Sequence, residues 1–183
     1  MTYPEYANIK GVKYKINTDF RVALRCFQLL DDDEITDEER AYATIYMLFG
    51  FVPEEDADLF LDKCKFYLQC GQTEKQQSSK EKDLDFFQDD KYIMASFMSD
   101  YQIDLSKEKL HWWQYVELIE GLTPNAVLSK IREIRNYDIS QVKDTKERQK
   151  IINAKNSVAL KEKKTKKQLE DDEFFEKLLK GGV

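Results

Sequence analysis

The chain has 183 residues, a formal net charge of −6, and a composition that is 42% hydrophobic and 35% charged. This length suits one domain with an appendage, and 11 Phe and 10 Tyr are enough for a core. Three cysteines, an odd number, argue against a disulfide framework. The first residues lack the features of a signal peptide, and no apolar run approaches the roughly 20 residues that span a bilayer. The sequence therefore predicts a soluble intracellular protein.

The charges are distributed unevenly along the chain. Residues 143–167 carry ten Lys or Arg and three acids, a net charge of +7, whereas residues 168–183 carry five acids and two lysines. The preceding 142 residues therefore sum to −10. This pattern predicts an acidic body joined to a basic arm that ends in an acidic tip.

A β-hairpin is predicted over about residues 5–17. Val12, Tyr14 and Ile16 alternate with polar residues, and Lys10-Gly11 forms a two-residue turn between two short runs. Because an isolated hairpin is marginally stable, we expect it to pack on the helices that follow.

Three helices are predicted between residues 17 and 71. The first follows the capping residues Asn17-Thr18-Asp19, and the second opens with a capping box at Thr36–Glu39 and ends at Gly50. The second helix runs through the apolar residues Ala43, Tyr46, Met47 and Phe49. The third has Pro53 and three acids in its first turn, is closed by Gly71, and presents a single apolar face made of Ala57, Phe60, Leu61, Cys64, Tyr67 and Leu68.

Three more helices are predicted after a polar loop at residues 72–83. One spans residues 86–101 with Ile93, Phe97 and Tyr101 on its apolar face. The next carries both tryptophans and ends at Gly121, and the last restarts at Thr123-Pro124 and breaks at residues 136–138. The fold class is therefore mainly α: a compact domain of about six helices with an N-terminal hairpin.

A charged arm follows this body, which gives a division into residues 1–141 and 142–183. From Val142 to Leu179 the chain has no Gly or Pro, but its apolar stripe is thin. Such a helix lacks a continuous apolar face, so we expect a long basic helix that is partly disordered beyond about residue 161.

The residues that usually carry chemistry lack a catalytic pattern. His111 is the sole histidine, and no Ser or Cys pattern around it indicates a nucleophile. Cys64 and Cys70 match no zinc spacing, and the acidic clusters lack the spacing of a calcium loop. The sequence predicts neither an enzyme nor a bound cofactor or metal.

Three features could bind a macromolecule. The basic arm could contact nucleic acid, although a solvated helix explains its lysines better. The tip, which contains Phe174, Phe175, Leu178 and Leu179, could dock in a groove of a partner or fold back on the core. Trp112, Trp113 and Tyr115 are adjacent on a helix, where core packing is the main expectation and one tryptophan could lie at an interface.

Several segments together resemble the bacteriophage "gene product fifteen" family over about residues 8–160. The most specific are Ile16-Asn17-Thr18-Asp19-Phe20-Arg21 and Leu110-His111-Trp112-Trp113. Leu118-Ile119-Glu120-Gly121-Leu122 and Leu128-Ser129-Lys130-Ile131 follow in the same order. The last twenty or so residues lie outside the resemblance.

The resemblance implies a role in the tail module of a long-tailed phage or prophage. Members of that family lie between the major tail protein and the tape measure protein, where genes usually encode tail assembly chaperones. The implied partner is the tape measure protein, with the major tail protein as a candidate second partner, in the host cytoplasm. Self-association is compatible with the sequence but is not shown by it. The sequence favours neither a membrane nor a nucleic acid as partner. The alternatives are a tail or connector subunit of the virion and a small nucleic-acid-binding protein.

Overall fold

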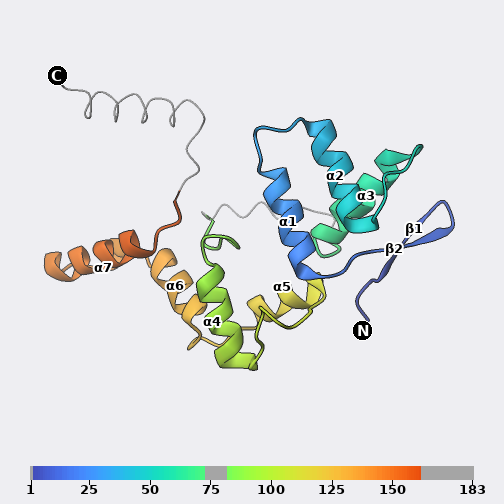
Figure 1. Cartoon of the computed structure of the whole chain (residues 1–183). Helices are drawn as coiled ribbons and strands as arrows, with labels where there is room; N and C mark the ends of the chain where they lie inside the picture. Colours follow the sequence, from blue (N-terminus) through green and yellow to red (C-terminus); the bar gives the residue numbers. More distant parts are fainter. Residues whose placement is uncertain (1, 73–81, 162–183) are drawn as a thin grey trace, which may run out of the picture.

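The computed structural model describes residues 2–72 and 82–161. Within these ranges a two-stranded hairpin is followed by seven α-helices, which confirms the predicted fold class (Figure 1). The elements are β1 (Tyr6–Ile9), β2 (Val12–Lys15), α1 (Phe20–Leu30), α2 (Asp37–Phe49), α3 (Ala57–Leu68), α4 (Asp90–Tyr101), α5 (Trp112–Glu120), α6 (Val127–Asn136), the 3-10 turn η1 (Ile139–Gln141) and α7 (Thr145–Val158).

The hairpin forms where the alternating pattern predicts it. The strands are antiparallel, with Ala7 opposite Tyr14, and the turn places Lys10 and Gly11 at positive φ. The ring of Tyr14 packs edge-on against Phe60 of α3 at a centroid distance of 4.9 Å. The hairpin is thereby held on the helices, as expected for two strands that are marginal alone.

The helix caps read from the sequence are present in α1 and α2. Asp19 accepts a hydrogen bond from the backbone N–H of Arg21. Thr36 and Glu39 form a reciprocal capping box, and Gly50 ends α2 in the left-handed conformation. These caps satisfy backbone groups that the helices themselves leave without partners.

Three helices begin later in the chain than the sequence predicts, and α3 and α6 are the first two. Pro53 and the acids after it precede α3, because Asp56 adopts a φ of +63° and its carboxylate pairs with Lys10 at 2.6 Å. Thr123-Pro124 belongs to a turn closed by the Ala126 N–H, so α6 begins at Val127.

The helix expected to begin at Phe86 instead begins at Asp90. Asp89 lies just before it, fully buried, where its carboxylate accepts two hydrogen bonds of 2.7 Å from Arg135 of α6. The Asp89 side chain also accepts the backbone N–H of Asp85. The Asp85 side chain in turn accepts the backbone N–H groups of Phe87 and Gln88. These local bonds and the tertiary pair with Arg135 together hold the residues before α4 in turns.

The buried face of α2 does not follow all the apolar residues of its sequence. Thr44, Ile45 and Leu48 are buried, whereas Tyr46 is 59% exposed. Met47 and Phe49 are partly buried and pack against the same core, whereas Tyr46 lies on the outward side of the helix. Tyr42 and Tyr46 consequently face outward from α2.

A single apolar core runs from the hairpin to the start of α6. α1 packs on α2 and α5, and α4 packs on α5 and α6, so α5 joins the two sides of the molecule. α7 packs on α6 and η1 and contains no buried residue. It extends at the opposite end of the molecule from α2 and α3 (Figure 1). The division into a body of residues 1–141 and an arm of residues 142–183 stays a prediction.

Candidate protein-binding surface

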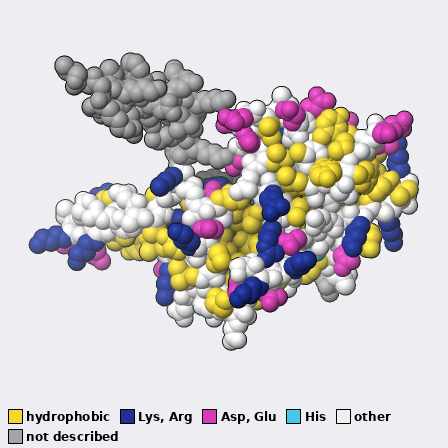
Figure 2. Space-filling model, viewed as in Figure 1, with side chains coloured by type: hydrophobic (Ala, Val, Ile, Leu, Met, Phe, Trp, Pro, Cys, Tyr) yellow, Lys and Arg dark blue, Asp and Glu magenta, His cyan; other side chains and the backbone are white. Residues whose placement is uncertain are grey.

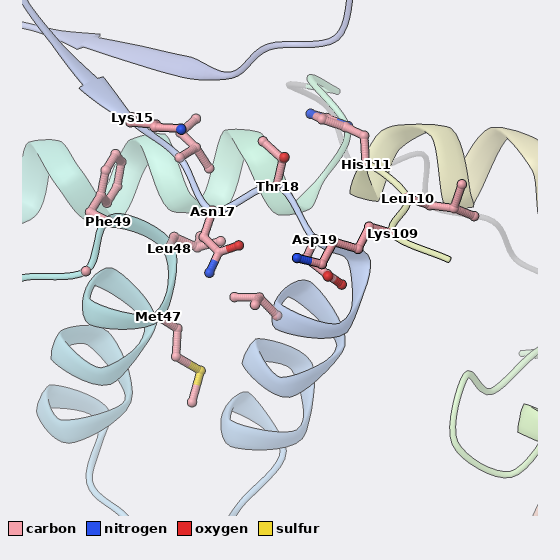
Figure 3. Close-up of a pocket in the computed structure, with 13 residues that line it drawn as sticks. Lys15, Asn17, Thr18, Asp19, Met47, Leu48, Phe49, Lys109, Leu110 and His111 are labelled. Atoms are coloured by element: carbon pink, nitrogen blue, oxygen red, sulfur yellow. The ribbon is translucent and has the colours of Figure 1, made fainter. Parts of the chain in front are cut away.

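The two most recognisable sequence segments meet in space. Between them, the Phe20 N–H donates to the Leu110 carbonyl at 3.0 Å, and the Trp112 N–H donates to the Thr18 carbonyl at 2.9 Å. These bonds pair the residues just before α1 with those just before α5, although some 90 residues separate them in sequence. Figure 3 shows this junction, with Asp19 beside Lys109.

His111 has a structural role in the junction. It is the N-cap of α5, where its Nδ1 accepts the Trp113 N–H at 3.1 Å, and its Nε2 lies 3.0 Å from the Pro4 carbonyl oxygen. Nε2 therefore carries the proton and donates it to that carbonyl. The imidazole also stacks on Tyr3 at 4.9 Å. With both nitrogens bonded, this ring is engaged in holding the N-terminal segment on α5.

A cavity of about 680 Å³ lies beside this junction, between α1, the end of α2 and residues 109–111 (Figure 3). Its charged groups are Lys15, Asp19 and Lys109. The Asp19 carboxylate already caps α1 and pairs with Arg21, whose guanidinium also donates to two carbonyls in residues 105–108. Asp19 and Arg21 hydrogen-bond the start of α1 to residues 105–108, and they do not form a catalytic pair.

Trp112 and Tyr115 lie in the core, each only 2% exposed. The Trp112 Nε1–H donates to the Leu68 carbonyl at 3.0 Å, and the Tyr115 ring stacks on Phe20 at 4.5 Å. Core packing therefore accounts for both side chains, and neither is available at the surface of this fold. Of the three aromatic residues predicted on this helix, Trp113 is the one at the boundary.

Trp113 is partly buried and firmly held. Its Nε1–H donates to the Tyr67 carbonyl at 2.8 Å, and its ring lies edge-on to Phe66, which is 44% exposed. Leu59 is also exposed and lies seven residues before Phe66, two turns along the same side of α3. Leu59, Phe66 and Trp113 form what we call the α3–α5 surface. The sequence prediction named Trp113 but missed the two α3 residues, which flank its predicted apolar face.

The remaining predicted binding residues cannot be placed on this surface. Phe174, Phe175, Leu178 and Leu179 lie outside the described residues. The predicted loop at residues 72–83 falls largely outside them as well.

The thiols are buried or partly buried and carry no activating neighbour. Burial raises the pKa of Cys26 and of Cys64 to about 12, and the pKa of Cys70 to about 11. Thiols with such pKa values stay protonated at neutral pH, whereas a nucleophilic cysteine needs a lowered pKa.

Across residues 2–72 and 82–161, His, Cys, Asp and Glu side chains form no group of three or more that could hold a metal ion. In the same part of the chain, every helix is too short or too polar to cross a bilayer.

Comparison with known proteins identifies the family. The family model described as "Bacteriophage Gp15 protein" matches residues 3–160, which include every described strand and helix. The chain belongs to the bacteriophage Gp15 family. No curated protein and no solved structure matches it. Gp15 proteins are phage proteins of a structural type, and the matched range contains both segments that meet at the α1–α5 junction.

Proposed function

We propose that this Gp15 protein is a tail assembly chaperone that binds the tape measure protein of its phage in the host cytoplasm. The observation that carries the proposal is membership of the Gp15 family over residues 3–160. Binding would be non-covalent and reversible, since a chaperone must release the tape measure protein when tail-tube subunits assemble around it. The major tail protein is the natural second partner at that step.

The α3–α5 surface supports the proposal. Leu59 and Phe66 are exposed on α3, and Trp113 is fixed beside them by its bond to the Tyr67 carbonyl. Aromatic anchors that are rigid before binding lose little conformational entropy on binding. An apolar helical segment of the tape measure protein could lie along this side of α3, in the way that amphipathic helices lie on apolar grooves.

Co-expression with the tape measure protein tests the proposal. We expect the wild-type chain to raise the soluble fraction of the tape measure protein and to co-purify with it. Leu59→Gln with Phe66→Gln should abolish both effects. The matched control is Met94→Gln with Met98→Gln, which makes the same change at two equally exposed apolar positions of α4. Circular dichroism should show that both double variants remain folded.

The outcomes separate this function from its nearest alternative. Insoluble tape measure protein beside a soluble wild-type chain would contradict chaperoning. The structural type of the family also favours a tail or connector subunit. Mass spectrometry of purified phage particles distinguishes the two, because a subunit stays in the particle and a chaperone leaves it.

A further inference from the structure

One end of the molecule is strongly acidic. Residues 31–62 contain twelve Asp or Glu and one basic residue, Arg40, a net charge of −11. The exposed carboxylates of Glu38, Glu54, Glu55 and Asp58 form no ion pair with any residue in the described ranges. We call residues 31–62 the acidic lobe; acidic side chains line its outer edge in Figure 2.

Exposed aromatic rings lie among these carboxylates. Glu38, Tyr42 and Tyr46 are spaced four residues apart on α2 and share one outward side. Phe51 and Val52, just after α2, are exposed as well. Carboxylates next to aromatic faces favour Lys and Arg, because the cation can pair with the carboxylate and also lie over the ring.

The other end of the molecule has the opposite charge. Residues 143–161, which we call the basic arm, contain six Lys or Arg and two acids, a net charge of +4. Lys146 and Lys150 lie one turn apart on α7, and both are exposed. Neither they nor Arg148 forms an ion pair within residues 2–72 and 82–161.

Glu38 of α2 and the exposed lysines of α7, Lys146 and Lys150, lie on elements at opposite ends of one molecule. The acidic lobe approaches the basic arm of its own chain at Asp31, which lines a cavity together with Lys155 and Lys161. α2 and α3 lie at one end and α7 at the other, with α4, α5 and α6 between them (Figure 1). α7 is held there by α6 and η1, by the bond from Arg135 to the Val158 carbonyl, and by the bond from Lys155 to the Tyr137 carbonyl. α7, which carries Lys146 and Lys150, thus lies at the opposite end of the molecule from α2 and α3.

We propose that the acidic lobe of one copy binds the basic arm of a second copy, head to tail. The charges are complementary, and Glu38, Glu54 and Glu55 on one side and Lys146 and Lys150 on the other form no ion pair within the described ranges. Such complementarity favours association and steers its orientation. Such a contact joins two different surfaces, so each added copy leaves one acidic lobe and one basic arm free. Repetition generates a ring or an open helical chain. Leu59 belongs to both the acidic lobe and the α3–α5 surface, but the inference rests on the charged residues of the lobe and not on Leu59.

Sedimentation velocity of the full chain at low and high salt tests this contact. At about 0.1 M salt the average mass should rise with protein concentration. At about 1 M salt, where the screening length falls from roughly 10 to 3 Å, it should return to that of one chain. A single mass at all concentrations in 0.1 M salt would overturn the proposal.

Charge reversal at either end should prevent association. The lobe variant is Glu38→Lys, Glu54→Lys, Glu55→Lys, and the arm variant is Lys146→Glu with Lys150→Glu. Each should raise the concentration for half-association about tenfold, since several exposed pairs are lost at once. The control, Lys91→Glu with Lys109→Glu, makes the charge change of the arm variant at exposed positions elsewhere and should associate as the wild type does.

Mixing the two variants tests the head-to-tail arrangement itself. For this test the same positions are changed to Gln, because a reversed lobe and a reversed arm would attract each other. The lobe variant keeps its basic arm and the arm variant keeps its acidic lobe, so the mixture should form one-to-one dimers that do not grow further. Failure to form dimers on mixing would contradict a contact between unlike surfaces. A wild-type chain that stays monomeric but binds duplex DNA, with binding lost in the arm variant, would assign the basic arm to nucleic acid and overturn the proposal.

Discussion

Trp113 can pack closely against the end of α3 because residue 71 is glycine. Gly71 has a φ of +77°, and a Cβ atom there would lie 2.9 Å from Cη2 of Trp113. Gly50 has nearly the same φ, +81°, with open space around it. Substitutions at the two glycines can therefore be compared: both positions carry the free-energy cost of a left-handed backbone, and only residue 71 adds the cost of a steric clash.

Alanine substitutions at these two positions should differ in their effect on stability. Gly50→Ala should lower the free energy of unfolding by about 1 kcal/mol, the cost of a left-handed alanine. Gly71→Ala should lower it by roughly 1–3 kcal/mol more, because the indole must shift. Urea denaturation followed by tryptophan fluorescence measures both. Equal losses would show that Trp113 is not confined by residue 71.

At the scale of elements, α4 and α6 are joined by a buried ion pair. Asp89 lies in the turn before α4 with its side chain 1% exposed, and Arg135 of α6 donates to both of its carboxylate oxygens. The hydrogen bonds to Asp89 raise the pKa of Arg135. One turn earlier on α6, Arg132 pairs with the more exposed Asp83.

Removal of the two arginines should therefore have unequal consequences. Arg135→Met leaves the Asp89 carboxylate buried without its partner and should cost about 3–5 kcal/mol of stability. Arg132→Met, the matched change on the same helix, should cost about 0–1 kcal/mol. Guanidinium denaturation compares them. If the two losses were similar, the Asp89 pair would not be what fastens α6 to α4.

At the scale of the whole molecule, the net charge of −6 conceals two opposite ends. The acidic lobe carries −11 over residues 31–62, and the basic arm carries +4 over residues 143–161. A charged partner or resin that approaches the molecule interacts with the charge of the end that faces it, and not with the net charge of the whole chain. Segregated charge of this kind affects association and its rate much more than it affects the fold.

Ion-exchange chromatography should reveal this segregation. At pH 7 and low salt the chain should be retained on a cation exchanger despite its negative net charge, because the basic arm can face the resin. Lys146→Glu with Lys150→Glu should elute at lower salt than the control, Lys91→Glu with Lys109→Glu, which has the same net charge. Identical elution of the two variants would refute a separate basic end.

Local signals in the sequence determined most of the helices and the hairpin. The capping box at Thr36, the cap at Asp19 and the alternation through Tyr14 act over a few residues, so their outcome hardly depends on the rest of the fold. The family resemblance was also recognisable in short sequence segments, and it is confirmed over residues 3–160.

Only the tertiary structure decided which side of a helix is buried and where some helices begin. Apolar residues lie on several sides of α2, and packing on its neighbours buried Ile45 and exposed Tyr46. Asp89 ends a turn because Arg135, distant in sequence, supplies the partner that its buried carboxylate requires. The candidate surfaces were also decided by the tertiary structure. Packing of the chain made Phe66 a neighbour of Trp113. It also placed α2 and α3 of the acidic lobe at the opposite end of the molecule from α7 of the basic arm.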